Sequence, residues 1–359
     1  MRKKKHTVSA AVLILILLFT SLSSSSCKPK YKEYNYQFLG TFDTVVNIVG
    51  HMTSQKKFDE LKTYAEKRFN ELNKLFDIYH EYDGIKNIKN INDNAGISPV
   101  VVEEEILNLL ILSKTWYTKT NGKVNVAFGN VLKIWHDYRT KADPEDDNPE
   151  IPTIEELQKA NENVSIDSIV LNLNNKTVFI SDPKVRLDVG AVAKGYATEI
   201  VVDELQELGF DSFAISAGGN VKISGKPLSK DRDNWIIGIQ NPEPDEDLIP
   251  SDDLIDRIAA NDTSIVTSGW YQRYFISGGK IYHHIIDPET LFPANYYKAV
   301  TIVYPDSGIC DILSTAIMLM PYETAAEFIK GIEGAQAYFV LFDGTVKTTA
   351  GMAKMLVAK

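Results

Sequence analysis

The sequence contains very little cysteine and no clustered histidine. Cys27 and Cys310 are the only thiols in 359 residues, and the chain has no Cys-x-x-Cys pair or His cluster of the kind that binds zinc or iron. If Cys27 is modified, no intramolecular disulfide can form. Cys310 lies between an apolar strand and an apolar helix, where a cysteine usually acts as a small buried hydrophobic side chain. We therefore expect a hydrophobic core to supply the stability, without disulfides, zinc or iron.

The sequence also lacks a surplus of positive charge. Its 38 Lys and Arg residues stand against 48 Asp and Glu residues, for a formal net charge of −10. Such an acidic surface repels nucleic acid, so nucleic-acid-binding functions are excluded. Much of the acid lies in residues 137–162 and 231–256, which are also rich in proline and polar residues. These two segments predict exposed excursions between ordered elements, and neither has the spacing of an EF-hand.

The N-terminal segment lacks an apolar run long enough for a comfortable membrane span. Residues 10–19 form its uninterrupted apolar core, which is shorter than the ~20 residues that a spanning helix needs. Four basic residues at positions 2–5 precede this core and a serine run leads from it to Cys27, a pattern typical of an export signal. A cysteine after small residues resembles a bacterial lipobox, although Ser24 stands where leucine is usual.

These features predict a signal peptide at residues 1–26, a tether at 27–35 and one domain at 36–359. The mature protein is then expected outside the cytoplasm, held at a membrane by a lipid on Cys27. Cleavage without lipid attachment is the alternative.

The remaining pattern predicts an α+β fold with a largely antiparallel sheet and flanking helices. Hydrophobic periodicity predicts helices at residues 56–76, 102–120, 192–208, 311–320 and 322–332. Alternation and turn residues predict strands at 38–49, 169–173, 177–180, 185–189, 213–216, 221–224, 235–240, 264–267, 271–277, 280–285, 299–304, 336–342 and 345–349. Hairpins outnumber crossovers in this order, which favours antiparallel pairing.

Asp311 and Thr315 form the most informative pair of side chains. They are four residues apart at the expected start of an apolar helix, so both oxygens face the same side, about one turn apart. A carboxylate and a hydroxyl are hard ligands of the kind that Mg²⁺ takes while it keeps substrate phosphates and waters as its other ligands. By themselves, the two residues are more typical of a capping acid and a threonine bonded to its own helix.

The segments around this pair resemble motifs of the ApbE family, the FAD:protein FMN transferases. Residues 267–293, TSGWYQRYFISGGKIYHHIIDPETLFP, resemble the Ser-Gly turn, aromatic strand and His-Ile-Ile-Asp-Pro turn that precede the family's Asp-x-x-x-Thr helix start. Further segments follow the family's order upstream: Leu39-Gly40-Thr41 with Leu for Met, IKNIN ending at Asn92, VNVAFGNVLKIW at 124–135, LDVGAVAKGYA at 187–197, and Ala217-Gly218-Gly219-Asn220. The resemblance covers roughly residues 36 to 350.

The resemblance implies a tunnelling-type α+β fold, with the flavin in a cleft between a helical subregion and the sheet. It also implies Mg²⁺-dependent transfer of FMN from FAD, the substrate, to a Thr or Ser hydroxyl of an exported protein, such as a subunit of a membrane redox complex, with release of AMP. The implied metal ligands are Asp311, Thr315 and the backbone carbonyl of Ala191. The implied catalytic residues are His284 and Lys194. The implied FAD contacts are Leu39, Tyr79, Lys123, Val124, Asn125, Asp188, Lys194, His284, Ile285 and Asp287.

Several of these assignments compete with ordinary structural roles. Tyr82 competes with Tyr79 as the residue that stacks on the isoalloxazine, Asp188 is equally suited to a helix N-cap, and Asp287 before Pro288 also suits a turn. Asn125 stands where the family often has Asp. Two other functions remain open: an FAD pyrophosphatase that gives FMN and AMP, and a flavin-binding lipoprotein without catalysis.

Overall fold

The structure is a computed structural model that describes residues 30–143, 145–228, 232–243 and 253–358. The predicted signal peptide and Cys27 lie outside the described residues. Residues 30–35 of the predicted tether are described, and from Lys32 on they belong to the first strand, where Lys32 pairs with Met52 and Asn35 with Val49, so the ordered fold begins before the predicted boundary at residue 36. Within the described ranges, no helix combines the length and the apolar character that crossing a membrane requires.

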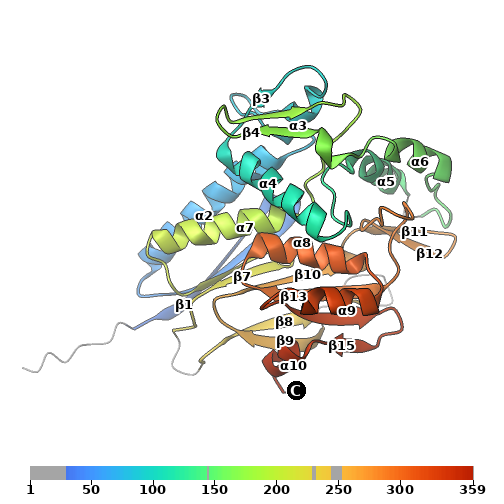
Figure 1. Cartoon of the computed structure of the whole chain (residues 1–359). Helices are drawn as coiled ribbons and strands as arrows, with labels where there is room; N and C mark the ends of the chain where they lie inside the picture. Colours follow the sequence, from blue (N-terminus) through green and yellow to red (C-terminus); the bar gives the residue numbers. More distant parts are fainter. Residues whose placement is uncertain (1–29, 144, 229–231, 244–252, 359) are drawn as a thin grey trace, which may run out of the picture.

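An antiparallel sheet forms the centre of the fold (Figure 1). Its strand order is β1-β2-β6-β7-β10-β13-β14-β15, and each neighbouring pair is antiparallel. The strands are β1 (Lys32–Thr41), β2 (Thr44–Met52), β6 (Phe213–Ala217), β7 (Asn220–Ser224), β10 (Ser264–Gly269), β13 (Tyr297–Tyr304), β14 (Gln336–Leu341) and β15 (Val346–Thr348). This arrangement confirms the predicted α+β fold with a largely antiparallel sheet.

Helices cover one face of this sheet, and a second layer covers the other (Figure 1). The first layer holds α2 (Gln55–Phe76), α7 (Ala193–Glu207), α8 (Ser307–Met318) and α9 (Tyr322–Lys330). The second holds β8 (Trp235–Gln240), β9 (Leu254–Ala260) and α10 (Ala350–Met355). Alternate residues of one strand therefore enter different cores: Val266 packs under the helices and Ile265 packs toward the second layer. Coverage of both faces agrees with the burial of most side chains in the inner strands β6, β10 and β13.

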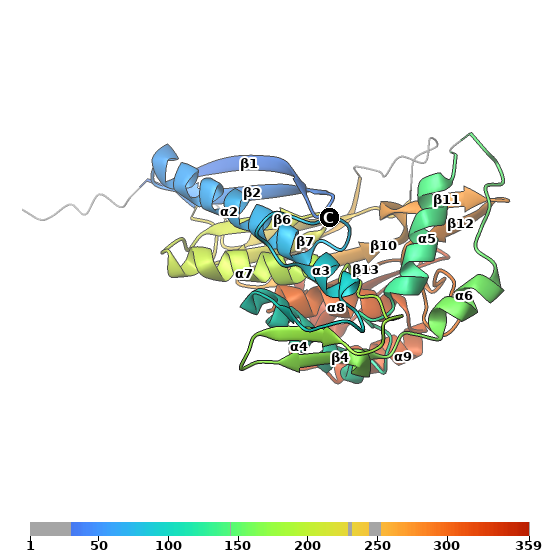
Figure 2. The ribbon, with the colours of Figure 1, turned by 90° about the horizontal axis from the view of Figure 1, so that it is seen from above.

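A helical subregion with two small sheets lies beside the central sheet and its two covering layers, which together are called the sandwich below (Figure 2). Its helices are α3 (Ile88–Asp93), α4 (Glu104–Lys119), α5 (Gly129–Lys141) and α6 (Ile154–Asn161). Its strands are β3 (Val100–Val101), β4 (Ile169–Asn172) and β5 (Thr177–Ile180), with the hairpin of β11 (Tyr274–Ser277) and β12 (Lys280–His283) near α5. Short 3₁₀ turns are η1 (Ile166–Ser168) and η2 (Trp270–Gln272).

The structure corrects four of the predicted elements. The single strand expected at 38–49 is the β1–β2 hairpin, which turns at Phe42 and Asp43, both with a φ of 51°; the turn lacks the glycine or asparagine that signals such geometry. Residues 271–277 begin with η2, and 185–189 form only a bridge between Arg186 and Phe128. The helix expected to begin at Asp311 begins at Ser307, because Asp306 caps it by accepting a bond from the N–H of Ile309.

The acidic segment 137–162 is also more ordered than predicted. Helix α5 continues through Lys141, and α6 occupies Ile154–Asn161. The start of α6 is a capping box, in which Thr153 and Glu156 each bond the other's backbone N–H. This local signal outweighs the acidic composition, because it satisfies N–H groups that a helix start otherwise leaves free.

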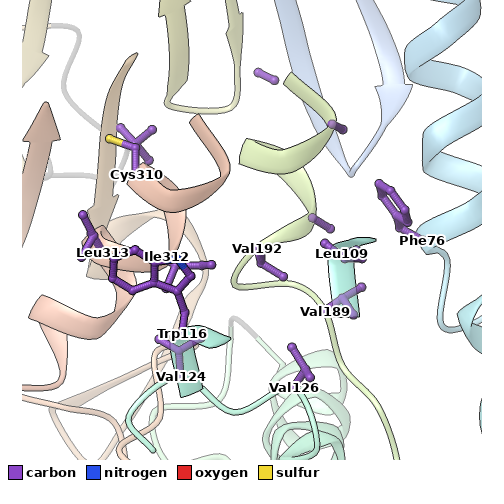
Figure 3. Close-up of a cluster of buried hydrophobic side chains, with 14 of the residues drawn as sticks. Phe76, Leu109, Trp116, Val124, Val126, Val189, Val192, Cys310, Ile312 and Leu313 are labelled. Carbon is purple, nitrogen blue, oxygen red and sulfur yellow. The ribbon is translucent and has the colours of Figure 1, made fainter. Parts of the chain in front are cut away.

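A buried cluster joins the helical subregion to the sandwich (Figure 3). Trp116 of α4 packs with Val124 from the following loop and with Ile312 and Leu313 of α8. Cys310 belongs to the same core, fully buried, and burial raises the pKa of its thiol well above the ordinary value. Its predicted role as a small hydrophobic side chain is confirmed.

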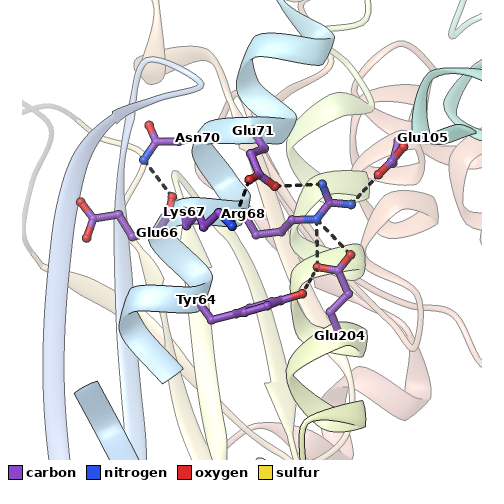
Figure 4. Close-up of polar contacts among 8 residues, drawn as sticks. All are labelled: Tyr64, Glu66, Lys67, Arg68, Asn70, Glu71, Glu105 and Glu204. Carbon is purple, nitrogen blue, oxygen red and sulfur yellow. Dashed lines mark hydrogen bonds and ion pairs between the residues drawn. The ribbon is translucent and has the colours of Figure 1, made fainter. Parts of the chain in front are cut away.

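An ion network ties three helices together at the edge of this core (Figure 4). Arg68 of α2 donates from Nε to both carboxylate oxygens of Glu204 on α7, at 3.0 Å each. Its Nη2 lies 2.5 Å from Oε1 of Glu105 on α4, and Tyr64 donates to Glu204 over 3.2 Å. These contacts fix α7 against the helical subregion, and the residues just before α7 form part of the candidate site.

Candidate functional site

Helices α7 and α8 meet closely where Gly195 faces Asp311. A Cβ atom on Gly195 would lie 2.3 Å from the carbonyl oxygen of Ser307 and 2.5 Å from Cβ of Asp311, so this contact requires glycine. The N–H of Gly195 donates to Oδ2 of Asp311 over 2.9 Å. The Asp311 side chain is 4% exposed. The close approach therefore places a buried carboxylate at the N-terminal end of α7.

The charge of Asp311 is only partly balanced by the protein. Burial raises the pKa of its carboxyl, while Lys194 with Nζ 3.8 Å away, the Gly195 N–H and the Asn220 side chain lower it. Nδ2 of Asn220 is buried close enough to this carboxylate to lower its pKa, but it makes no hydrogen bond of ordinary geometry with it or with any other described residue. A buried acid beside an unsatisfied amide is typical of a place that a ligand completes.

The oxygen atoms beside this carboxylate suit a hard cation. Thr315 is half-buried, and its hydroxyl has no hydrogen-bond partner in the described part of the chain. The Asp311 carbonyl, to which a threonine four residues later could donate, accepts the hydroxyl of Ser314. The carbonyl of Ala191, one residue before the N-cap of α7, accepts no hydrogen bond from any described residue. The described residues contain no group of three or more His, Cys, Asp or Glu side chains placed for a metal. One carboxylate, one hydroxyl and one carbonyl fit Mg²⁺, which takes few protein ligands when substrate phosphates complete its shell.

The turn before α7 is held by side chains from distant parts of the chain. Asn92 bonds both the N–H and the carbonyl of Leu187, at 2.7 and 3.0 Å. The carboxylate of Asp188 accepts from the N–H of Gly190 over 2.8 Å, and burial raises its pKa. Asp188 therefore shapes the turn that presents Ala191 and does not cap α7, whose N-cap is Val192.

The two adjacent histidines have different surroundings. His283 is 2% exposed, and its Nε2 lies 2.7 Å from the carbonyl oxygen of Ala294. His284 is half-buried, and its Nδ1 lies 3.2 Å from the carbonyl oxygen of Arg273. Because a carbonyl can only accept, Nδ1 of His284 carries the proton and Nε2 remains a free acceptor. Desolvation lowers the pKa of His284, with further lowering by His283 and by the cations Arg273, Arg139 and Lys194.

Of the two candidates for stacking on the isoalloxazine, Tyr79 is the one whose ring is open to a ligand. Its side chain is 47% exposed, and its ring centroid lies 5.3 Å from that of His136 on α5. Tyr82 instead donates its hydroxyl to Asp77 over 2.7 Å. Tyr79 and His136 thus form an open aromatic surface between the end of α2 and α5.

Sequence reasoning missed several groups of the site: His136, Arg139, Arg186, Arg273 and Asn220. Arg139 and His136 lie three residues apart on α5, and their side chains are joined by a hydrogen bond of 3.2 Å. The sequence did not suggest this contact, because residues 137–162 were expected to be irregular and exposed. Arg273 lies in the quoted TSGWYQRYF segment, where a charged residue among aromatic ones was the available signal. Asn220 could have been found from its place directly after the Gly-Gly turn.

Other predicted site residues are engaged in the fold. Lys123 pairs with Asp287 over 3.1 Å and with Glu289 over 2.8 Å, and Asp287 also accepts the N–H of Glu289. Val124 and Ile285 are buried core residues. The Asn125 amide donates from Nδ2 to the Val164 carbonyl and accepts the N–H of Ala127 at Oδ1.

Leu39 has a different setting from these residues. It lies on β1 with 72% of its side chain exposed, on the strand that enters the hairpin turn at Phe42.

The chain is similar to known flavin transferases in sequence and in structure. The model of the ApbE family matches residues 42–339. A Treponema pallidum protein named FAD:protein FMN transferase is 30% identical over 274 residues, which cover 73% of this chain and 72% of that protein. A Klebsiella pneumoniae protein of the same name is 28% identical over 298 residues, 82% of this chain and 87% of that one.

Solved structures agree with this similarity. The ApbE protein of Thermotoga maritima superposes with a TM-score of 0.76 at 26% identity, covering 91% of this chain and 99% of that one. The Pseudomonas stutzeri flavinyl transferase ApbE in its apo form has a TM-score of 0.74 at 20% identity, covering 92% of this chain and 98% of that one, which supports the fold.

Proposed function

The chain belongs to the ApbE family and is a transferase, and we propose that it moves the FMN half of FAD to a Thr or Ser hydroxyl of an exported acceptor protein and releases AMP. The names of its relatives support FAD as substrate and a protein as acceptor. The observation that carries the proposal is the buried, incompletely balanced Asp311 of α8, which faces the start of α7, with Lys194 and free oxygens of Ala191 and Thr315 nearby. Such a group of residues suits a substrate with two phosphates.

We propose that Asp311, Thr315 and the Ala191 carbonyl hold Mg²⁺ when FAD is bound. The ion would neutralise charge on the phosphate oxygens, which is the main requirement of phosphoryl transfer. The protein's own residues then orient the reaction. Lys194 at the first turn of α7 attracts the phosphate, aided by the positive end of the helix.

His284 is the proposed general base. The acceptor hydroxyl oxygen attacks the phosphorus of the FMN half, its proton passes to Nε2 of His284, and the bond from phosphorus to the bridging oxygen breaks, leaving its electron pair on AMP. The bond to the Arg273 carbonyl holds the ring in the required tautomer. The low pKa keeps the imidazole neutral before substrate binds. Bound phosphates would offset the positive charges that help to lower this pKa, so the pKa of His284 should rise and the ring should accept a proton more readily.

The open aromatic surface of Tyr79 and His136 is the proposed stacking place for the isoalloxazine. Flat aromatic rings stack favourably when they are offset, and Tyr79 exposes nearly half of its side chain. The side chains of Lys123, Asn125 and Asp287 already have protein partners, so we assign them a supporting role, with any FAD contact made beside those bonds.

The proposed transfer reaction is tested by incubating the mature protein with FAD, Mg²⁺ and candidate exported proteins from the same organism. We expect an acceptor that becomes fluorescent in a denaturing gel and gains the mass of FMN on a Thr or Ser, with one AMP released per FMN attached. Subunits of membrane redox complexes are the first candidates. Omitting Mg²⁺ should stop the labelling.

The same assay separates transfer from hydrolysis. Release of AMP and free FMN without label on any acceptor would make the protein an FAD pyrophosphatase, in which water replaces the hydroxyl. FAD binding without any AMP release would leave a non-catalytic flavin-binding protein.

We also propose that Cys27 carries a lipid that anchors the mature protein outside the cytoplasm. The support is the signal-like sequence before it. We expect the protein to fractionate with membranes until detergent is added, and the Cys27→Ser variant to lose the acyl mass from its N-terminal peptide. Wild-type protein that is fully released without detergent and has no acyl mass would refute the anchor.

A further inference from the structure

Helices α7 and α8 are joined by two hydrogen bonds in which each helix donates a free N–H to a carboxylate of the other. The N–H of Gly195, in the first turn of α7, donates to Oδ2 of Asp311 on α8 over 2.9 Å. The N–H of Ser307, the first residue of α8, donates to Oε2 of Glu199 on α7 over 2.5 Å. The two residues of each helix are four positions apart, so the bonds lie about one turn apart on both helices. Together they fix the position of α8 along α7.

The carboxylate of Glu199 is itself held by a buried lysine. Nζ of Lys222 on β7 lies 2.9 Å from Oε1 of Glu199, and the two side chains are only 10% and 17% exposed. Nζ of Lys222 also donates to the carbonyl of Pro305 over 2.6 Å, two residues before α8 begins. This ion pair therefore connects the central sheet, α7 and the start of α8.

A buried ion pair is a costly way to hold two helices together. Removing both charges from water costs free energy that their attraction only roughly repays, and apolar side chains of similar size often stabilise a core equally well. The pair differs from an apolar contact in its direction, because Glu199 can satisfy the Ser307 N–H and the Lys222 ammonium together in few arrangements. It is therefore suited to selecting one register of α7 and α8.

The proposed Mg²⁺ ligands are divided between these two helices. Ala191 lies in the turn before α7, whereas Asp311 and Thr315 lie on α8. Mg²⁺ requires oxygen ligands at about 2.0–2.1 Å in a nearly octahedral arrangement. The distances between the three ligands therefore depend on the register that the bond between Glu199 and Ser307 helps to set.

We propose that Glu199 is a positioning residue, which together with Lys222 holds the start of α8 so that Asp311 and Thr315 face Ala191 at the distances that Mg²⁺ requires. This inference rests on the proposed metal-dependent transfer and assigns it a further residue. The Glu199 carboxylate is already shared by the Ser307 N–H and the Lys222 ammonium. Its effect therefore passes through α8, without a contact to the metal or to FAD.

Two double variants test this role: Glu199→Gln with Lys222→Met, and Glu199→Met with Lys222→Met. Both remove the two charges, so neither leaves a buried charge unpaired, but only the glutamine offers an oxygen to the Ser307 N–H. The measurement is the binding of Mn²⁺, as the probe, to the mature protein with FAD and without acceptor, followed by the electron paramagnetic resonance of free Mn²⁺. We expect the Glu199→Met double variant to bind Mn²⁺ about 10-fold to 100-fold more weakly than the Glu199→Gln one, the usual range for a residue that orients metal ligands.

The same exchange at an exposed position is the matched control. Glu207→Met and Glu207→Gln, at the end of α7, should bind Mn²⁺ equally well. Urea unfolding shows which variants are folded under the conditions of the titration. If the Glu199→Met double variant does not fold, Glu199→Asp replaces it: the charge is kept, the reach is one methylene shorter, and Mn²⁺ binding should again weaken.

The possible results keep this role apart from the transfer reaction. Equal Mn²⁺ affinity of the two double variants, with only a lower unfolding midpoint for Glu199→Met, would overturn the positioning role and leave Glu199 a structural one. Wild-type protein that binds no Mn²⁺ would refute the metal site and the positioning role together. Weak Mn²⁺ binding by the Glu199→Met double variant, with strong binding but no labelled acceptor for the wild type, would support the positioning role and refute the transfer reaction alone.

Discussion

Asp311→Asn should lower the rate of FMN transfer by about 10³-fold, or about 4 kcal/mol of barrier, while the chain stays folded. The substitution removes the buried carboxylate of α8 that faces the N-terminal end of α7 and lies 3.8 Å from the Lys194 ammonium. Its shape is kept, and the new amide oxygen can still accept the N–H of Gly195. The loss should therefore be one of charge toward Mg²⁺ and phosphate. The measurement is the initial rate of acceptor labelling across a Mg²⁺ titration.

A matched control separates this effect from a general loss of charge. Glu327→Gln removes an exposed carboxylate on α9, whose partner Lys330 lies at 3.4 Å on the surface, and it should leave the rate unchanged. Wild-type rates for Asp311→Asn at limiting Mg²⁺ would show that this carboxylate holds no metal. A rate restored by raising Mg²⁺ would instead support the assignment, since a weakened site fills at higher concentration.

Gly195→Ala should both destabilise the fold and reduce transfer. The added methyl group would meet the Ser307 carbonyl at 2.3 Å and Cβ of Asp311 at 2.5 Å, and neither is the flexible end of a side chain. Helices α7 and α8 must then separate, which breaks the bond from the Gly195 N–H and moves Asp311 away from Lys194. We expect the free energy of unfolding to fall by about 1–3 kcal/mol, the usual cost of overpacking. Urea unfolding followed by circular dichroism measures the first effect, and acceptor labelling measures the second.

An exposed position on the same helix provides the comparison. Glu207→Ala at the end of α7 should change the free energy of unfolding by no more than about 0.5 kcal/mol, because its side chain faces water. If Gly195→Ala unfolds at the same urea concentration as this control, the close contact between α7 and α8 does not limit stability. If it is destabilised but labels the acceptor at the wild-type rate, the contact does not position Asp311 for the reaction.

Much of the fold could be predicted because its signals are local. The 3.6-residue periodicity of α2 places Phe58, Leu61 and Phe69 in the core, and the helix observed at Gln55–Phe76 agrees with the predicted 56–76. The β4–β5 and β6–β7 hairpins follow from their turn residues, and both pairs are antiparallel as expected. Where the local signal was atypical, the prediction failed, as at the Phe42–Asp43 turn.

Part of the candidate site could also be predicted from spacing and motif order. Asp311 and Thr315 share one face of α8 because they are four residues apart, and this holds even though the helix begins four residues earlier than expected. The order of motifs led to the ApbE family, which the matched family model supports. The family resemblance therefore identified Lys194, Asp311 and His284 as candidates before any geometry was available.

Only the tertiary structure decided which of these candidates have free atoms and what surrounds them. Asp287 and Asn125 are polar residues in motif positions, yet their side chains already have protein partners, whereas Thr315 has none among the described residues. Arg139 and Arg273 are 134 positions apart, and no sequence period relates them. The physical reason is that helix and strand periods are set by the local backbone, whereas burial, charge balance and the approach of α7 to α8 depend on which distant segments the folded chain brings into contact.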